Sequence, residues 1–146
     1  DLVPLLGHVR DSLQPLASDL GVEIKLDLPK HPVSVPGDRD ELVEVFENLI
    51  ENACKYGQEG KRVDVVLSGG GDTPVELSVT DYGPGIPPEH VPRITERFYR
   101  VNVEASRSKK GTGLGLAIVK HILTRHRARL VVKSEVGKGT VFTVKF

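Results

Sequence analysis

A run of alternating glycines is the strongest chemical signal in this chain. Residues 111–116 read Gly-Thr-Gly-Leu-Gly-Leu and lead directly into an apolar segment. Backbone N–H groups without intervening side chains can close on a phosphate, and the N-terminus of a following helix adds partial positive charge. Glycine costs a helix up to about 1 kcal/mol relative to alanine, so three glycines at a helix start indicate a specific backbone requirement. The alternative is a loop that only permits tight helix–sheet packing.

An acidic residue followed by two spaced glycines lies about thirty positions upstream. Asp81 is followed by Gly83 and Gly85. An ionised carboxylate only accepts hydrogen bonds, so it suits an exocyclic amine such as the adenine N6 group. The glycines would let a flat base lie close to the backbone. In isolation, however, an Asp-Gly turn that closes a hairpin is the more common explanation.

Two asparagines and a lysine share one face of a predicted helix further upstream. At about 100° per residue, Asn48, Asn52 and Lys55 lie on the side opposite an apolar stripe. Asparagine is a poor helix former, so two of them one turn apart need a reason, although simple solvent exposure is the alternative. Amide oxygens can coordinate Mg²⁺ and a lysine can neutralise a phosphate. Because no GxxxxGK[ST] occurs, these features indicate a nucleotide site of a type other than the P-loop.

Composition narrows the class of protein. The 146 residues are enough for one domain, and 20 basic against 20 acidic residues argue against a nucleic-acid binder. The single cysteine, Cys54, excludes an internal disulfide, and no apolar run is long enough to span a bilayer. The chain contains no methionine, so we expect it to be part of a longer protein. None of the five histidines has the surroundings of a phosphoacceptor.

Hydrophobic periodicity predicts the elements that must position these residues. We expect a first helix over residues 2–19 that Pro15 kinks or ends, a capped helix from Asp38 to Gly57, and a third helix from Gly113 to about His126. Alternation predicts strands over 22–26, 62–68, 75–80, 130–133 and 141–144, with hairpin turns at 69–72 and 137–139. A short edge strand over 33–35, a short helix over 88–94 and a loop over 101–112 complete the prediction.

Taken in order, four stretches resemble the ATP-binding catalytic domain of bacterial sensor histidine kinases. This group also contains gyrase B, Hsp90 and MutL. Residues 47–56 match the N box of the family, 81–86 its G1 box, 97–101 its F box and 111–116 its G2 box. The resemblance covers essentially the whole chain, so we expect one domain over residues 1–146. It implies an α+β fold, a two-layer α/β sandwich with three helices on one face of a mixed sheet of about five strands.

The resemblance also implies a role for individual residues. Asn52, helped by Asn48, would hold Mg²⁺, and Asn48, Lys55 and Arg100 would act in catalysis. Tyr56 would flank the adenine and Asp81 would accept from its N6 amine. The remaining expected ATP-binding residues are Gly83, Gly85, Ile86, Tyr99, Lys110, Gly111, Thr112, Gly113, Leu114, Gly115, Leu116 and Thr140.

One position separates the kinases of this group from its hydrolytic members, which carry a glutamate four residues before the metal-binding asparagine. Here that residue is Asn48, and an amide cannot deprotonate water near neutral pH. Together with Asn48, the resemblance implies transfer of the ATP γ-phosphoryl to a histidine on a separate dimerisation domain, and from there to a response regulator. A regulatory pseudokinase module is the alternative, because Thr95 and Asn102 depart from the F-box pattern. We expect a cytoplasmic domain whose parent protein is either anchored in the inner membrane or not.

Overall fold

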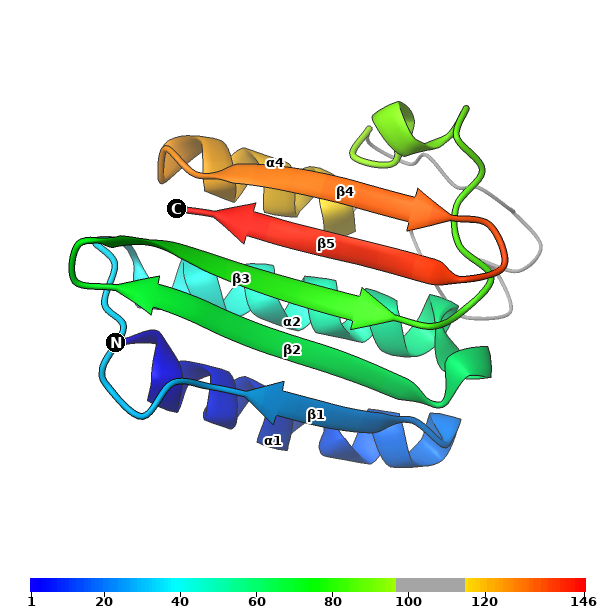
Figure 1. Cartoon of the computed structure of the whole chain (residues 1–146), viewed down its shortest axis with the longest axis horizontal. Helices are drawn as coiled ribbons and strands as arrows, with labels where there is room; N and C mark the ends of the chain where they lie inside the picture. The colour runs from blue at the N-terminus through cyan, green and yellow to red at the C-terminus, as the bar shows by residue number, and fades with distance from the viewer. Residues whose placement is uncertain (97–114) are drawn as a thin grey trace.

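Five strands with alternating burial form one mixed sheet (Figure 1). The computed structural model describes residues 1–96 and 115–146. Along the sheet the order is β1-β2-β3-β5-β4, with β1 and β2 parallel and every other neighbouring pair antiparallel. The strands are β1 (Glu23–Asp27), β2 (Arg62–Gly70), β3 (Thr73–Asp81), β4 (Arg129–Glu135) and β5 (Gly139–Lys145).

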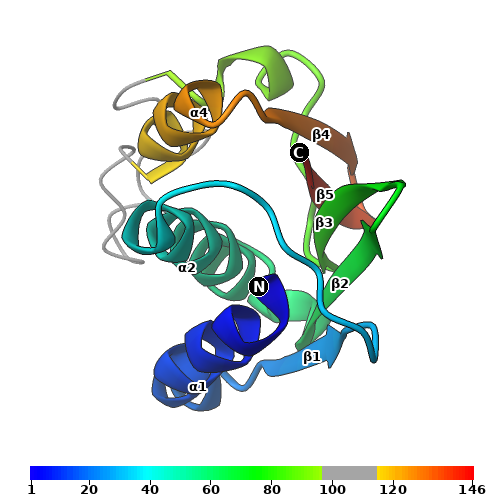
Figure 2. The same ribbon diagram turned by 90° about the vertical axis from the view of Figure 1, so that its left-hand side faces the viewer.

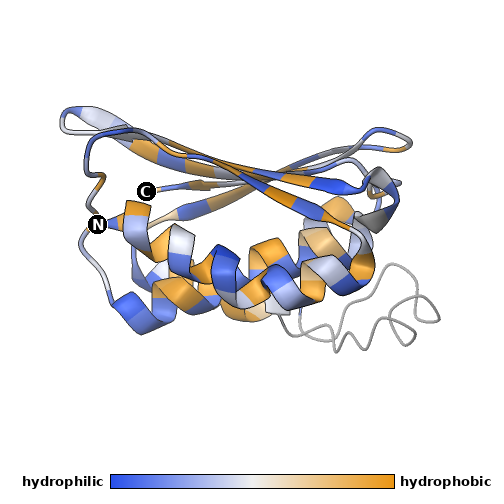
Figure 3. Ribbon diagram, turned by 90° about the horizontal axis from the view of Figure 1, so that it is seen from below, coloured by the Kyte–Doolittle hydropathy of each residue, from blue (hydrophilic) through white to orange (hydrophobic). Residues whose placement is uncertain are grey.

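Three α-helices of the described residues cover one face of this sheet and leave the other face open (Figures 2 and 3). They are α1 (Leu2–Leu20), α2 (Arg39–Tyr56) and α4 (Gly115–Arg125), and α2 packs between the other two. Alternate strand residues such as Val63, Val65 and Val79 point into this interface and are fully buried. The two-layer α+β sandwich expected from the sequence is confirmed.

Helix α2 is the element that carries the predicted asparagines. Its apolar stripe, which includes Phe46, Leu49 and Ile50, is fully buried against the sheet and the neighbouring helices. The Asp38 side chain caps the helix by accepting from the backbone N–H of Glu41 at 3.0 Å. Gly57 ends it, as expected. The stripe therefore fixes which face of α2 is turned away from the core.

The C-terminal end of α4 is tied to the start of α2. His126 Nε2 accepts a hydrogen bond from the backbone N–H of Asp38 at 3.0 Å, while its Nδ1 lies 2.9 Å from the carbonyl of Ile122. Since a carbonyl only accepts, Nδ1 carries the proton and the ring is held as the neutral Nδ1–H tautomer. Arg125 pairs with Glu41 at 2.6 Å beside it. These contacts set the position of α4 along α2.

The helix predicted over residues 2–19 is confirmed, and the short edge strand predicted over 33–35 is wrong. Helix α1 does not end at Pro15 but continues to Leu20, because Pro15 lies on the exposed side, where the carbonyl that loses its hydrogen-bond donor can face water. Residues 33–35 form no strand. The backbone N–H of Val33 donates to the Asp1 carboxylate at 3.2 Å and its carbonyl accepts from Leu2 N–H at 2.7 Å, so both groups are used by the start of α1.

The turns differ from the prediction in detail. Strands β2 and β3 extend to a tight turn at Gly71 and Asp72, with a bulge between Ser68 and Gly70. The helix expected over 88–94 is only a 3₁₀ turn, Val91–Arg93. The final hairpin has the predicted turn between β4 and β5. The predicted loop over 101–112 and the first two residues of the predicted third helix lie outside the described residues.

Candidate nucleotide site

A row of polar side chains interrupts the apolar inner face at one end of the sheet. Asp81 ends β3 and is paired with Thr140 of β5, which is in turn paired with Ser134 of β4. Directly paired residues of antiparallel strands point to the same face, so these side chains are neighbours. Asp81 is 6% exposed and Thr140 is 3% exposed, and they are the buried polar residues of the described part of the chain. We call this row, with the loop over 82–86, the base end, because the sequence predicts that a nucleotide base lies here.

The Asp81 carboxylate is held by backbone amides. The N–H of Gly83 donates to Oδ1 at 3.0 Å. Burial raises the pKa of Asp81 above its ordinary value, and the backbone N–H groups of Gly83 and Thr140 partly oppose that shift. A side chain at Gly57 would overlap Asp81, so the glycine that ends α2 lets the helix approach this carboxylate closely. Asp81 is thus a buried acceptor at the junction of α2 and the sheet.

Side-chain contacts from β2 and from β4 hold the loop after Asp81. Tyr82 donates its hydroxyl to Asp64 on β2 at 2.5 Å, and the guanidinium of Arg62 lies 4.7 Å from the centre of its ring. On the other side, the N–H of Ile86 donates to Ser134 Oγ at 2.7 Å. Gly85 has φ +78° and lies against the backbone of Glu135, where a Cβ would not fit. These contacts give the loop a defined conformation.

The three polar residues predicted on one face of α2 lie there, and Asn48 and Lys55 make polar contacts with residues of the same helix. Asn48, Asn52 and Lys55 are all half-buried. Asn48 Nδ2 donates to the Glu44 carbonyl at 2.8 Å, and Lys55 Nζ lies 2.8 Å from Glu51 Oε1. We call these three residues, with the first turn of α4, the phosphate end.

Helix α4 begins directly beside Asn48. A Cβ built on Gly115 would lie 2.9 Å from Asn48 Oδ1, closer than ordinary contacts allow. Since Nδ2 is bonded to Glu44, the amide oxygen of Asn48 is the atom that faces α4. Gly115 therefore lets the start of α4 and the Asn48 amide oxygen come close together.

The remaining expected residues fall into two groups. Tyr56 is half-buried in the last turn of α2, and Ile86 and Leu116 are partly buried hydrophobic residues that pack against the core. Seven lie outside the described residues: Tyr99, Arg100, Lys110, Gly111, Thr112, Gly113 and Leu114.

Ser134, Arg62 and Asp64 are residues that the sequence analysis missed. Ser134 could have been found from the predicted final hairpin, because pairing 133 with 141 also pairs Ser134 with Thr140. Arg62 and Asp64 gave no such signal. They alternate on the polar face of a strand, and the sequence does not show that Tyr82 folds back onto them.

The donor set fits a magnesium ion held mainly by phosphate. Mg²⁺ binds oxygen and commonly takes one or two protein ligands beside waters and substrate phosphates. The described residues contain no group of three or more His, Cys, Asp or Glu side chains that could hold a metal alone. The Asn48 amide donates its N–H to Glu44, which leaves its oxygen available toward the first turn of α4.

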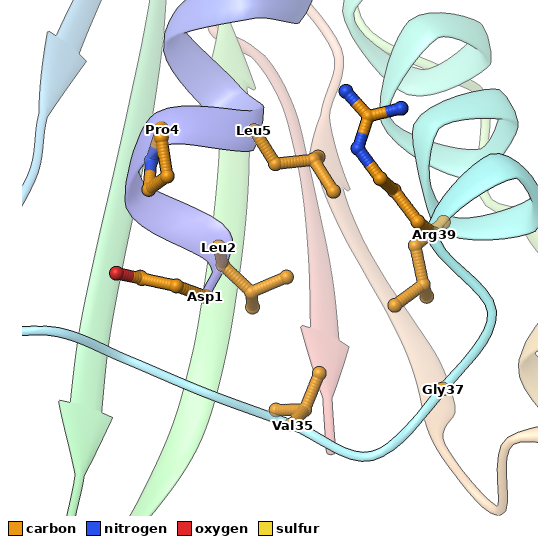
Figure 4. A pocket seen from close by; sticks show the side chains of 8 residues that line it. Asp1, Leu2, Pro4, Leu5, Val35, Gly37 and Arg39 are labelled. Carbon is orange, nitrogen blue, oxygen red and sulfur yellow. The ribbon is translucent and has the colours of Figure 1, made fainter.

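A separate hollow of about 340 Å³ lies at the opposite end of α2 (Figure 4). Figure 4 shows it between the first turn of α1, the segment with Val35 and Gly37, and Arg39 at the start of α2. None of the residues predicted for the nucleotide site lines it. This hollow is therefore not part of the base end or the phosphate end.

Comparison with known proteins assigns the arrangement to a family. The Histidine kinase-, DNA gyrase B-, and HSP90-like ATPase family matches residues 37–146. The chain is 43% identical over 142 residues to the phosphate regulon sensor protein PhoR of Pseudomonas aeruginosa, covering 97% of this chain and 32% of PhoR. It is 36% identical over 144 residues to the sensor protein SrrB of Staphylococcus aureus, covering 99% of this chain and 24% of SrrB. The chain thus spans about a third or less of these relatives.

Solved structures agree with the sequence relatives. The mycobacterial sensor histidine kinase MprB superposes with a TM-score of 0.84 at 31% identity, covering 100% of this chain and 93% of that one. Full-length ShkA in complex with AMPPNP also gives 0.84 at 30% identity, covering 99% of this chain and 29% of ShkA. No helix in residues 1–96 or 115–146 is long and apolar enough to cross a membrane. The chain belongs to the histidine kinase-, DNA gyrase B- and HSP90-like ATPase family and, within it, groups with the catalytic domains of sensor histidine kinases.

Proposed function

We propose that this chain binds Mg-ATP and that its γ-phosphoryl group is transferred to a histidine of a separate dimerisation domain. The observation that carries the proposal is the Asp81 carboxylate, buried at the end of β3 and held by backbone amides. Burying a charge is costly, so a carboxylate kept at a buried position is a candidate functional group. Here the N6 amine of adenine would donate to it. The AMPPNP complex of the related ShkA supports an adenine nucleotide as the ligand.

In this proposal the phosphates lie between α2 and the start of α4. The metal would be held by Asn52 and Asn48, and it would neutralise charge on the phosphate oxygens when bound. Lys55, half-buried on the same face of α2, would exchange Glu51 for a phosphate oxygen. Arg100 and residues 110–114 would complete the phosphate contacts, as the resemblance implies.

Asn48 is the reason to propose a kinase rather than a hydrolase. Its amide donates to the Glu44 carbonyl and has no basic lone pair to take a proton from water. At 100° per residue, Glu47 lies about 100° and Glu51 about 60° around the helix from Asn48, both on the same side. Glu51 is also paired with Lys55. The position that a glutamate holds in the hydrolytic members is thus occupied by an amide, so we expect slow attack by water and transfer of the γ-phosphoryl to the acceptor histidine.

Incubation with labelled ATP, with and without an added dimerisation domain from a related kinase, tests the proposal. We expect nucleotide binding without self-phosphorylation, slow phosphate release, and acid-labile label only on the added domain. Asn48→Glu should raise phosphate release if the geometry is shared with the hydrolytic relatives. Nucleotide binding with no transfer to any acceptor would favour the regulatory module instead. Rapid hydrolysis by the unmodified chain would refute the role of Asn48.

The whole protein's role follows as part of the same proposal. We infer that the domain works on the cytoplasmic side, within a longer kinase whose phosphohistidine supplies a response regulator. The names of the relatives, which are sensor proteins several times longer than this chain, support that placement.

A further inference from the structure

Ser134 joins three segments at the base end with a single hydroxyl group. Its Oγ accepts from the N–H of Ile86 at 2.7 Å, lies 3.1 Å from the carbonyl of Gly139, and lies 2.9 Å from Thr140 Oγ1. It thereby links the loop over 82–86 to β4 and β5. None of the residues assigned to the nucleotide above has this bridging position.

The protons of this network can be assigned by counting. A serine hydroxyl has one proton to donate and two lone pairs to accept with. The Ile86 N–H takes one lone pair. The carbonyl of Gly139 can only accept, so it takes the proton of Ser134. The contact with Thr140 is then satisfied when Thr140 donates its own proton to the second lone pair.

This assignment makes the Thr140 hydroxyl a hydrogen-bond acceptor for any further partner. With its proton directed at Ser134, the Thr140 oxygen offers only lone pairs to anything else. Its neighbour on the same row, the ionised Asp81 carboxylate, also only accepts. The two buried oxygens therefore form a surface of acceptors.

We propose that Ser134 is a positioning residue that determines base specificity, by holding Thr140 as an acceptor and fastening Ile86 of the adjoining loop. The proposal rests on the proposed nucleotide function of this end of the sheet. Adenine presents an amine to such a surface, whereas hypoxanthine and guanine present a carbonyl oxygen. A carbonyl oxygen of the base that faces Thr140 and Asp81 would meet only acceptors, so these buried groups would have no hydrogen-bond donor. Unpaired buried polar groups lower the affinity for the wrong ligand.

The test compares ADP with inosine diphosphate, which lacks the amine and carries a carbonyl in its place. Calorimetry is done on the unmodified chain, on Ser134→Ala, and on Ser134→Thr, which keeps the hydroxyl. Ser78→Ala is the matched control, because Ser78 is a half-buried strand serine on β3 whose neighbours in the sheet, Val66 and Thr143, lie on the open face.

We expect the unmodified chain and Ser78→Ala to prefer ADP. In Ser134→Ala, the Thr140 hydroxyl can donate its proton to the carbonyl of inosine diphosphate. The preference for ADP over inosine diphosphate should therefore fall by about 2- to 10-fold, the effect of one hydrogen bond. Ser134→Thr should restore it. An unchanged preference in a folded Ser134→Ala protein that binds ADP would overturn the role of Ser134 alone. Failure of the unmodified chain to bind ADP would overturn the proposed function itself.

Hydrogen exchange provides a second measurement that does not depend on the alanine variant folding. The Ile86 amide of the unmodified chain should be protected in the absence of nucleotide, since its donor is bonded to Ser134. An Ile86 amide that exchanges as fast as an unbonded loop amide would overturn the proposal.

Discussion

The two ends of the candidate site are built from different kinds of contact. At the base end, the backbone N–H groups of Gly83 in the adjoining loop and of Thr140 on β5 hold the Asp81 carboxylate, and Ser134 joins β4 to that loop. At the phosphate end, Asn48 and Lys55 bond to residues one turn earlier in their own helix, Glu44 and Glu51. One end is held by tertiary structure and the other by local structure.

This difference has consequences for mutation. A change at the base end disturbs contacts between segments, so it should affect nucleotide affinity and the free energy of unfolding together. A change on the polar face of α2 breaks only local bonds, so the fold should persist while the chemistry is lost. Affinity, stability and transfer rate measured on the same variants can therefore contradict or sharpen the comparison.

The largest expected effect is that of Asn52→Ala at the phosphate end. Loss of a metal ligand removes several kcal/mol of charge stabilisation, so transfer to an added dimerisation domain should slow by roughly 100-fold or more. Thermal unfolding should change little, because Asn52 is half-buried on the polar face of α2. Asp40→Asn, on an exposed residue at the start of the same helix, is the control. A normal transfer rate for Asn52→Ala would mean that the metal is held elsewhere.

Asp81→Asn is the corresponding change at the base end. The amide presents a donor to the N6 amine and carries no charge, so loss of one charge-assisted hydrogen bond should cost about 1.5–3 kcal/mol of ADP affinity. Calorimetry measures it. An unchanged ADP affinity would remove Asp81 from the base end.

The same variant should change how stability depends on pH. Burial raises the pKa of folded Asp81 above the ordinary 3.8, so the folded state binds the proton more tightly than the unfolded state. Ionised Asp81 thus costs stability above its folded pKa, and the cost disappears as the pH falls toward 3.8. Asp81→Asn should unfold at a higher temperature than the unmodified chain at pH 7, and this difference should shrink on acidification through that window. A difference that grows instead would contradict the raised pKa.

Gly115→Ala separates stability from chemistry at the junction of α2 and α4. Alanine is favoured over glycine by about 1 kcal/mol in a helix interior and by less at the first residue, where Gly115 lies, so the free energy of unfolding should rise by less than about 1 kcal/mol. Its Cβ would lie 2.9 Å from Asn48 Oδ1, and the amide, as the end of a side chain, would have to turn away. We expect transfer to slow by roughly tenfold, because small displacements of positioning groups cost rate. Gly7→Ala, in the open on α1, is the control for the helix effect alone.

The sequence predicted most of this molecule because its strongest patterns are local. The apolar stripe of α2, the Asp38 cap and the final hairpin each depend on residues close in the chain, and all are confirmed. Val33 was misassigned because its backbone is satisfied by Asp1 and Leu2, which are distant in sequence. The fastening of Tyr82 by Arg62 was missed for the same reason. Asp81 was chosen from its glycine neighbours, but its burial depends on Gly57, which only the packed structure reveals.

The smallest expected effect tests whether Lys55 is available to a phosphate. Its ion pair with Glu51 is 2.8 Å long, with side chains 20% and 38% exposed, so it is partly screened by solvent and worth about 0–1 kcal/mol. Glu51→Gln removes the competing charge and frees the ammonium group, which should raise ATP affinity by up to about fivefold and leave the unfolding temperature nearly unchanged. Because the change also removes a negative charge from the site, Glu47→Gln on the same helix controls for general electrostatics. Equal gains in ATP affinity in both variants would show that the affinity rises only because a negative charge is removed. The ion pair between Lys55 and Glu51 would then not limit the contact of Lys55 with a phosphate.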